Sequence, residues 1–306
     1  MSRVDQFPPP ALMRRVGSLP EGFNNREGYL ELGRATRAAI EELLPAPWSW
    51  DGTRTLDFGC GAGRTLRHFV AEASRGTFYG CDIDRDSIAW VRSHFVPPFE
   101  VFLVDEAPPL SLPDASLDLI YAISVFTHIT IHWSSWLLEL HRLLRPDGLL
   151  LVTFMGEGMG PRVSGEPWNE DQIGMTVFAP HQEWDLGGPM VLHSPWWIQE
   201  HWGRLFAIEI LNPSGFGGGA PVFGTHNHGV VLMRKSAKAC TREDLQRPNP
   251  DDGRELKALT YQVDRLLRWP TGREANTISG RQAARALLDA GRRRLPWPIQ
   301  RASHAP

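Results

Sequence analysis

The most informative segment of the chain reads LDFGCGAGR and spans residues 56–64. Its apolar beginning predicts the end of a buried strand, and the residues that follow predict a helix, Arg64–Ala73. Glycines recur at positions 59, 61 and 63. Without Cβ atoms, they allow positive φ angles and close approach of the backbone to a bound molecule. We therefore expect a strand, a tight turn and a helix N-terminus whose free N–H groups face a ligand.

The spacing of these glycines favours one class of ligand. A dinucleotide-binding turn has the pattern G-x-G-x-x-G and follows a pyrophosphate. Here the pattern is G-x-G-x-G, and Asp57 lies two residues before Gly59. A carboxylate at this position suits an ammonium group and repels a pyrophosphate, so we expect a ligand with a zwitterionic amino-acid part. The alternative is a tight turn that binds nothing.

A second acidic residue follows the next predicted strand. Asp82 ends the segment FYGCD, residues 78–82. An acid at the carboxyl end of the second strand can accept hydrogen bonds from both hydroxyls of a ribose. By itself, such an acid is more often the cap of the next helix. Because the glycine-rich turn precedes the strand that Asp82 ends, we favour the interpretation that Asp82 binds a ribose.

Strand-like and helix-like segments alternate along residues 51–235, which predicts a mostly parallel sheet with helices on both faces. The apolar runs that predict strands are Thr55–Phe58, Phe78–Cys81, Val101–Val104, Leu117–Ala122, Leu149–Phe154, Phe206–Leu211 and Val230–Met233. Further helices are predicted over Asp86–Phe95, Ser134–Leu144, Ser194–Trp202, Glu255–Trp269 and Ile278–Leu288. Asp86 and Ser194 are the expected N-terminal caps, and Pro146-Asp147-Gly148 predicts a turn.

Composition narrows the function classes. The chain has 306 residues, of which 42% are hydrophobic, and a net charge of −3. It can bury a sizeable core, and this charge argues against a dedicated nucleic-acid binder. Its three cysteines are too few for a disulfide framework. No apolar run approaches the length of a membrane-spanning helix, and the N-terminus lacks the apolar region of a secretory signal, so we expect a cytoplasmic protein.

Charge is unevenly distributed along the chain. Residues 1–235 carry 18 Lys and Arg against 27 Asp and Glu, whereas residues 236–306 carry 14 against 8. We expect an N-terminal helical cap (1–50), a main domain (51–235) with a loop-rich insertion (156–193), and a basic linker with a helical tail (236–306). The tail, with Arg292-Arg293-Arg294, is a candidate contact for an anionic surface or a pathway enzyme, although a solvated surface is the default interpretation.

Four segments in order resemble the class I S-adenosylmethionine-dependent methyltransferases. They are LDFGCGAGR (56–64), GCDID (80–84), APPLSLPDASLDLIYAISVFTHI (107–129) and WLLELHRLLRPDGLLLVTF (136–154). The resemblance covers residues 53–155 well and extends weakly to about residue 235. It implies a seven-stranded, doubly wound α/β sheet with strand order 3-2-1-4-5-7-6 and an antiparallel last strand. A helical extension would follow at the C-terminus.

The resemblance also implies S-adenosyl-L-methionine as the cofactor and S-adenosyl-L-homocysteine as its product. The methionine part would lie against Phe58, Gly59, Cys60, Gly61 and Gly63, with Asp57 near the amino group. Asp82 would hold the ribose and Ile83 would pack on the adenine, whose amino group Asp105 or Glu106 would reach. Ser124 and Val125 would flank the sulfonium. Tyr29 and Gly33 resemble part of a helix that folds over the cofactor in related enzymes, with ordinary helix packing as the alternative.

Histidines near the expected methyl group suggest how an acceptor is deprotonated. His128 lies just past the fourth predicted strand and is either a general base or a structural residue. His132 follows at i+4, but no third ligand has a recognisable spacing, so we expect no metal site.

Two loops follow later in the chain. Residues 168–202 hold five tryptophans, which either wall an acceptor site or anchor the loop. In the glycine-rich loop Asn212–His228, His226 and His228 are weaker candidates for the same site.

The sequence thus predicts a methyltransferase that acts on a small molecule, with oxygen weakly preferred as the acceptor atom. A sugar hydroxyl or glycolipid acceptor is suggested by resemblance alone. Two alternatives remain. One is a catalytically inactive cofactor-binding scaffold for a partner enzyme, since no base is certain. The other is a nicotinamide-dependent oxidoreductase, which would need the G-x-G-x-x-G spacing that residues 59–63 do not offer.

Overall fold

The computed structural model describes residues 6–15, 26–183, 187–216 and 228–268. Its centre is a seven-stranded sheet with the order β3-β2-β1-β4-β5-β9-β8. The strands are β1 (Arg54–Phe58), β2 (Thr77–Asp82), β3 (Glu100–Leu103), β4 (Leu117–Ala122), β5 (Leu144–Phe154), β8 (Phe206–Asn212) and β9 (Gly229–Lys235). Each of the seven predicted strands is present, and their boundaries shift by a few residues.

The predicted strand order is confirmed. Strands β3, β2, β1, β4 and β5 are parallel, and β9 is antiparallel to both β5 and β8. When only the strands of this sheet are numbered, β8 and β9 are the sixth and seventh, which gives 3-2-1-4-5-7-6. Because β4 lies at the centre of the sheet, all six of its residues are buried.

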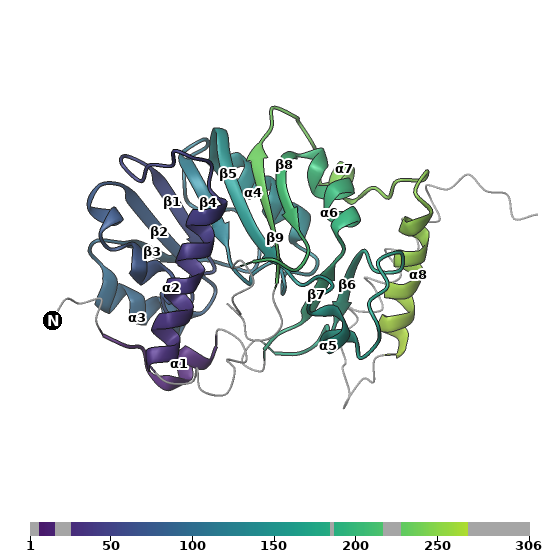
Figure 1. Cartoon of the computed structure of the whole chain (residues 1–306), viewed down its shortest axis with the longest axis horizontal. Helices are drawn as coiled ribbons and strands as arrows, with labels where there is room; N and C mark the ends of the chain where they lie inside the picture. The colour runs from purple at the N-terminus through teal and green to yellow at the C-terminus, as the bar shows by residue number, and fades with distance from the viewer. Residues whose placement is uncertain (1–5, 16–25, 184–186, 217–227, 269–306) are drawn as a thin grey trace, which may run out of the picture.

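Helices cover both faces of the sheet (Figure 1). One face packs against α4 (Trp133–Leu143), α6 (Pro195–His201) and α7 (Arg242–Gln246). The other packs against α2 (Arg26–Leu43) and α3 (Arg85–Phe95). The apolar stripe predicted on α4 is buried, including Trp136, Leu137 and Leu140. The carboxyl ends of β1, β2 and β4 thus meet at one edge of the sheet, between the two helical layers.

The prediction of an α-helix over Arg64–Ala73 is wrong. In its place are turns and two short 3₁₀ segments, Leu66–Phe69 and Glu72–Ser74. Side chains of α2 bond to this region: Arg37 donates to the carbonyl of His68 and pairs with Glu72 at 2.7 Å. These contacts and the positive φ of Gly63 replace the regular i to i−4 ladder of an α-helix. Local periodicity could not reveal them, since α2 is distant in sequence.

Three smaller predictions need correction. Asp84, rather than Asp86, caps α3, and its side chain accepts from the Asp86 N–H. Ser194 stands at the cap position of α6, but its side chain makes no capping hydrogen bond. The turn predicted around Asp147 is a bulge inside β5, where the register with β4 shifts between Leu117 and Leu119. Asp147 adopts the positive φ of 63° that such a bulge requires.

The segment predicted as a loop-rich insertion contains ordered elements. They are α5 (Gly160–Ser164) and a second sheet of two antiparallel strands, β6 (Met175–Phe178) and β7 (Met190–His193). Short strands of this kind are hard to predict because their pairing partners lie outside the local pattern.

Helices flank the sheet domain at both ends of the chain. The described N-terminal residues form α1 (Pro10–Arg14) before α2, and α8 (Gly253–Arg268) follows α7. The helix predicted at Ile278–Leu288 and the arginines at 292–294 lie outside the described residues. Among the residues that the structure describes, no helix combines the length and the apolar character that crossing a bilayer requires.

Gly63 offers a test of how tightly the glycine-rich turn packs. Its φ is +75°, and a Cβ there would lie 2.6 Å from Cε2 of Phe95. Gly63→Ala should therefore cost about 1–2 kcal/mol for the left-handed backbone and about 1–3 kcal/mol more for the overlap. Gly52→Ala is the matched control, because its φ is +73° with nothing within 4 Å of the added Cβ. Urea unfolding of both variants measures the difference; equal losses would contradict the packing argument.

Candidate functional site

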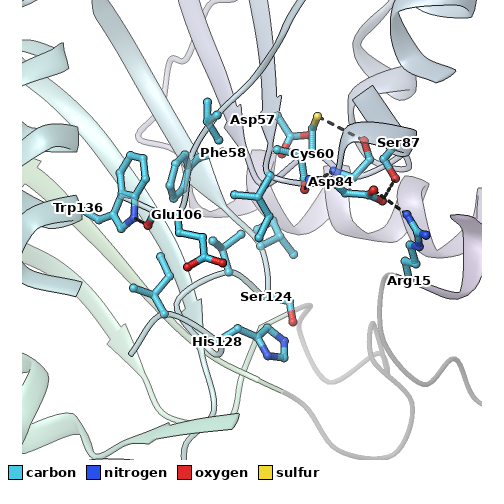
Figure 2. A pocket seen from close by; sticks show the side chains of 18 of the residues that line it. Arg15, Asp57, Phe58, Cys60, Asp84, Ser87, Glu106, Ser124, His128 and Trp136 are labelled. Atoms are coloured by element: carbon cyan, nitrogen blue, oxygen red, sulfur yellow. Dashed lines mark hydrogen bonds and ion pairs between the residues drawn. The ribbon is translucent and has the colours of Figure 1, made fainter. Parts of the chain in front are cut away.

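A cavity of about 750 Å³ opens at the carboxyl ends of β1, β2 and β4. Its volume lies within the range of small-molecule sites, roughly 300–1,000 Å³. Figure 2 shows His128 beside Ser124 in one part of the cavity and Arg15 with Asp84 in another. Residues from all four sequence segments that predicted the family line it together with residues of the insertion.

The glycine-rich turn forms one wall of this cavity. Gly59, Gly61 and Gly63 all have positive φ angles, of 82°, 51° and 75°. The N–H groups of Gly59 and Cys60 donate to the Cys81 carbonyl at 2.8 and 2.9 Å, which ties the turn to β2. A Cβ on Gly59 would come within 2.3 Å of Val125 Cγ2. Glycine is therefore required here by both backbone conformation and space.

Asp57 is an acid buried at the end of β1. Its side chain lines the cavity although the residue is only 3% exposed. Among the described residues, its Oδ2 has no hydrogen-bond partner. Burial raises the pKa of Asp57 to about 8; the Tyr121 hydroxyl and the Arg64 guanidinium act against this rise, and the Asp82 carboxylate adds to it. An acid in this state gains stabilisation from a cationic group placed beside Oδ2.

Asp82 faces the same cavity and organises its wall. Its Oδ2 accepts the Gly61 N–H at 2.7 Å and its Oδ1 accepts the Asp84 N–H at 2.8 Å. Burial raises the pKa of Asp82, and these backbone hydrogen bonds act in the opposite direction. Each carboxylate oxygen can accept more than one hydrogen bond, so Asp82 retains capacity for hydroxyl donors.

Most of the predicted site residues meet at this cavity. Those that line it are Asp57, Phe58, Gly59, Cys60, Gly61, Asp82, Ile83, Asp105, Glu106, Ser124, Val125 and His128. Ser124 has a positive φ of 61° and donates its N–H to Thr153 Oγ1 at 2.7 Å. Strain of this kind at the end of a central strand is common at functional sites.

Three predicted residues do not line the cavity. Gly63 packs on Phe95, as described above. Tyr29 is fully buried and donates its hydroxyl to the Ala62 carbonyl at 3.3 Å. A Cβ on Gly33 would lie 2.3 Å from the Arg64 carbonyl oxygen. Tyr29 and Gly33 therefore hold α2 tightly against the back of the glycine-rich turn. This position corresponds to ordinary helix packing, the alternative given for these two residues.

Sequence reasoning missed several lining residues. Arg64 and Thr65 continue the glycine-rich turn, so the motif itself was a signal for them. Arg15 reaches the cavity from the end of α1 and pairs with Asp84 at 2.6 Å. The insertion adds Pro180, Gln182, Gly187 and Pro189. Nothing in the local sequence indicates that these distant segments meet at the cavity.

His128 is held by a contact from the insertion. Its Nδ1 lies 2.7 Å from the carbonyl oxygen of Pro189. A carbonyl oxygen can only accept, so Nδ1 carries the proton. Burial lowers the pKa of His128, with the Pro189 carbonyl acting in the opposite direction, so the ring is neutral near physiological pH. In this tautomer, Nε2 bears the lone pair and can accept a proton.

The tryptophans and histidines of the two later loops were also candidates for an acceptor site, and those that the structure describes lie outside the cavity. Of the tryptophans between residues 168 and 202, Trp184 lies outside the described residues, and the other four do not line the cavity. Trp196, Trp197 and Trp202 are buried, and Trp196 Nε1 donates to the Glu170 carbonyl at 2.8 Å. They anchor the segment to the body of the protein. His228 is buried beside His128 and Arg64 and does not line the cavity, whereas His226 lies outside the described residues.

His132 lines the cavity together with His128. Within the described ranges, no group of three or more histidine, cysteine or acidic side chains is arranged to hold a metal ion.

Comparison with known proteins identifies the central segment. Residues 56–152 match the family described as a methyltransferase domain. The chain carries a class I methyltransferase domain. It also shares the fold of a Listeria monocytogenes protein assigned to the S-adenosylmethionine-dependent methyltransferases, with a TM-score of 0.50 and 14% identity over 68% of this chain and 99% of that one. The PH0226 protein of Pyrococcus horikoshii has a TM-score of 0.50 at 16% identity, covering 70% of this chain and 94% of that chain.

Curated relatives of this methyltransferase domain include enzymes named for lipid acceptors. A phthiotriol/phenolphthiotriol dimycocerosates methyltransferase of Mycobacterium ulcerans is 31% identical over 127 residues, which is 41% of this chain and 45% of the relative. A fatty-acid O-methyltransferase of Mycolicibacterium smegmatis is 30% identical over 104 residues, 34% of this chain and 37% of the relative. The chain thus matches less than half the length of these relatives.

The buried Asp57 of the methyltransferase domain predicts a pH-dependent stability. Its pKa is about 8 in the folded protein against 3.8 as the ordinary value. Between these values the folded protein holds a proton that the unfolded chain has lost, so stability falls as the pH rises. Asp57→Asn removes this titration. Its free energy of unfolding relative to wild type should rise by about 3 kcal/mol from about pH 5 to about pH 8. Denaturant unfolding at both pH values measures this change, and a constant difference would contradict the burial argument.

Proposed function

We propose that this chain transfers a methyl group from S-adenosylmethionine to an oxygen atom of a small-molecule acceptor. The observation that carries the proposal is a pair of acids, the buried Asp57 and the half-buried Asp82, that face one cavity beside a turn with three positive-φ glycines. This arrangement fits a ligand that joins an amino acid to a nucleoside. The family match of residues 56–152 supports the same cofactor.

The residues of the cavity fit the parts of this cofactor. The unpartnered Oδ2 of Asp57 suits an ammonium group, and the bare backbone of the glycine-rich turn suits close approach of the methionine part. Asp82 would accept the ribose hydroxyls, and Ile83, which is 36% exposed, would pack on the adenine. Asp105 or Glu106 would reach its amino group, and Ser124 and Val125 would flank the sulfur. When bound, the cofactor supplies a methyl group activated by a positively charged sulfur.

The acceptor would enter beside the insertion. Pro180, Gln182, Gly187 and Pro189 line this part of the site, together with Ile129 and Thr130. Holding an acceptor in line with the methyl group and excluding water accounts for much of the catalysis of a methyl transfer.

His128 would remove the proton of a hydroxyl acceptor. Its neutral ring, with Nδ1–H donated to Pro189, leaves Nε2 as the proton acceptor. Oxygen is also the acceptor atom in the names of two kinds of relative: the fatty-acid O-methyltransferase and a malonyl-[acyl-carrier protein] O-methyltransferase of Yersinia pestis, 25% identical over 162 residues. Together these points favour an oxygen atom on an acceptor with an apolar body.

The direct test uses radiolabelled S-adenosylmethionine. The purified chain is incubated with a panel that contains a long-chain fatty acid, a long-chain alcohol and a glycolipid, and also with a cell extract. We expect a base-stable or ester-linked label on an oxygen of one acceptor, identified by mass spectrometry. Binding of S-adenosylhomocysteine without transfer to any acceptor would favour the scaffold alternative, and thermal protection by NADH alone would favour an oxidoreductase.

Asp82→Ala tests the cofactor site. The variant loses the acceptors for the ribose hydroxyls and also releases the N–H groups of Gly61 and Asp84. We expect affinity for S-adenosylhomocysteine to fall at least about tenfold, because hydrogen bonds to charged groups contribute about 1.5–3 kcal/mol each. Titration calorimetry measures the affinity. Asp51→Ala is the control, since Asp51 is exposed and pairs with Arg75 away from the cavity. Wild-type affinity in Asp82→Ala would refute its role.

His128→Gln tests the proposed base. Once an acceptor is identified, its turnover should fall by roughly 10²–10⁴, the usual contribution of a positioned general base. Affinity for S-adenosylhomocysteine should stay within about twofold, because the role concerns the acceptor. Initial rates at saturating cofactor measure the effect. His132→Gln is the comparison, since His132 lines the same cavity. If turnover falls in His132→Gln and not in His128→Gln, the general base is His132 rather than His128.

A further inference from the structure

The C-terminal helix α8 contacts the insertion rather than the central sheet. It packs along β6, on the side away from β7 (Figure 1). The N–H of Val177 in β6 donates to Oε1 of Gln262 at 2.6 Å, and Gln262 is only 7% exposed. A side chain of α8 thus occupies the outer edge of β6 in the way that another strand would. The edge of a short two-stranded sheet needs such a partner.

Three more contacts hold the insertion to α8. The guanidinium of Arg265 lies over the Phe178 ring, 5.6 Å from its centroid, and forms an ion pair with Glu166. The Tyr261 hydroxyl lies 3.1 Å from the same Glu166 carboxylate. At its other end, α8 is fixed by Glu255, which lies 3.1 Å from His201 of α6. The helix therefore connects the insertion to the helical layer of the main domain.

The opposite side of the β6–β7 hairpin contacts the proposed base. The N–H of Val191 in β7 donates to the Thr127 carbonyl at 2.8 Å. Two residues earlier, the Pro189 carbonyl accepts from His128 Nδ1 at 2.7 Å. The hairpin also bonds to the end of β5, since His193 N donates to the Met155 carbonyl at 2.8 Å. Thr127 and His128 are neighbours, so β7 holds the backbone of this segment and Pro189, the residue just before β7, holds its ring.

The hairpin register links these two sides directly. Val177 pairs with Val191 across the two strands. In an antiparallel pair, the N–H groups of opposite residues point either toward each other or outward. Here both point outward, one to Gln262 and the other to Thr127. The hairpin is therefore a two-strand spacer between α8 and the segment that carries His128.

We propose that α8 is a positioning element for His128, and that Gln262 is its main positioning residue. By fixing the edge of β6, Gln262 fixes β7 and the Pro189 carbonyl, and thereby the tautomer and orientation of the His128 ring. This inference rests on the proposed function for its catalytic meaning. It assigns a role in the reaction to residues 253–268, which lie far outside the segment that matches the methyltransferase family.

The test measures the His128 ring itself, so it needs no acceptor. Ring nitrogens of the uniformly ¹⁵N-labelled full chain are observed by long-range proton–nitrogen correlation, and His128→Gln assigns the signal by its loss. Wild type should show a protonated Nδ1 and an unprotonated Nε2. Gln262→Met removes the acceptor for Val177 at similar side-chain length. We expect the Nδ1 resonance to shift toward the unprotonated position, and amide exchange at Val191 to speed up at least tenfold.

Matched variants separate positioning from general loss of structure. Gln262→Glu keeps an acceptor oxygen and should restore the wild-type ring signals. Lys257→Ala changes an exposed residue of α8 and should leave them unchanged. If Gln262→Met does not fold, Arg265→Met, which removes the contacts with Phe178 and Glu166, gives the same readout. Unchanged His128 signals in a folded Gln262→Met or Arg265→Met protein would overturn the proposal.

Failure of this inference is distinguishable from failure of the proposed function. Affinity for S-adenosylhomocysteine is measured on the same samples, and we expect it to stay within about twofold of wild type in Gln262→Met. With an identified acceptor, turnover should fall at least tenfold in Gln262→Met and recover in Gln262→Glu. Wild-type protein that fails to bind S-adenosylhomocysteine would refute the proposed function, while the ring signals would still decide whether α8 positions His128.

Discussion

The carboxylate of Asp82 fixes the shape of the whole site. Its two oxygens accept the N–H groups of Gly61 and Asp84, so one side chain joins the turn after β1 to the turn before α3. The N–H groups of Gly59 and Cys60 reinforce this link through the Cys81 carbonyl. Positive φ angles at three glycines let the turn reach that position without side-chain bulk. The cavity exists because these two strand ends are tied together.

Local patterns predicted the features that depend on nearby residues. Short apolar runs such as Leu117–Ala122 made the central strands recognisable, and all six residues of this strand are buried. The order of the sheet came from resemblance, since apolar runs carry no information on which strands pair. The segment after Arg64 was mispredicted as a helix because Arg37 of α2, which lies far away in the sequence, bonds to the His68 carbonyl and the Glu72 side chain.

The same distinction applies to the site. Asp57, Asp82 and His128 were predicted because each lies at or just past the carboxyl end of a strand, and these ends meet at one edge of the sheet. Arg15, Gln182 and Pro189 come from segments without a motif and reach the cavity only through tertiary packing. Tyr29 and Gly33 resembled residues over a cofactor, yet they pack behind the turn, where a tyrosine hydroxyl bonds to the Ala62 carbonyl. Sequence spacing alone does not show whether a residue lies on the cavity side of a turn or on its opposite side.

Electrostatics divides the cavity into two regions. Burial raises the pKa values of Asp57 and Asp82, and at Asp57, where the pKa reaches about 8, the acid holds a proton that a bound cation would replace. Around His128, burial lowers the pKa and the Pro189 carbonyl selects a neutral tautomer. Under the proposed function, a positively charged sulfonium bound between these regions would be attracted to the acidic side and would not be repelled by a charged imidazole. Because Pro189 of the insertion supplies the contact at His128 Nδ1, the His128 side of the cavity depends on residues outside the segment 56–152 that matches the methyltransferase family.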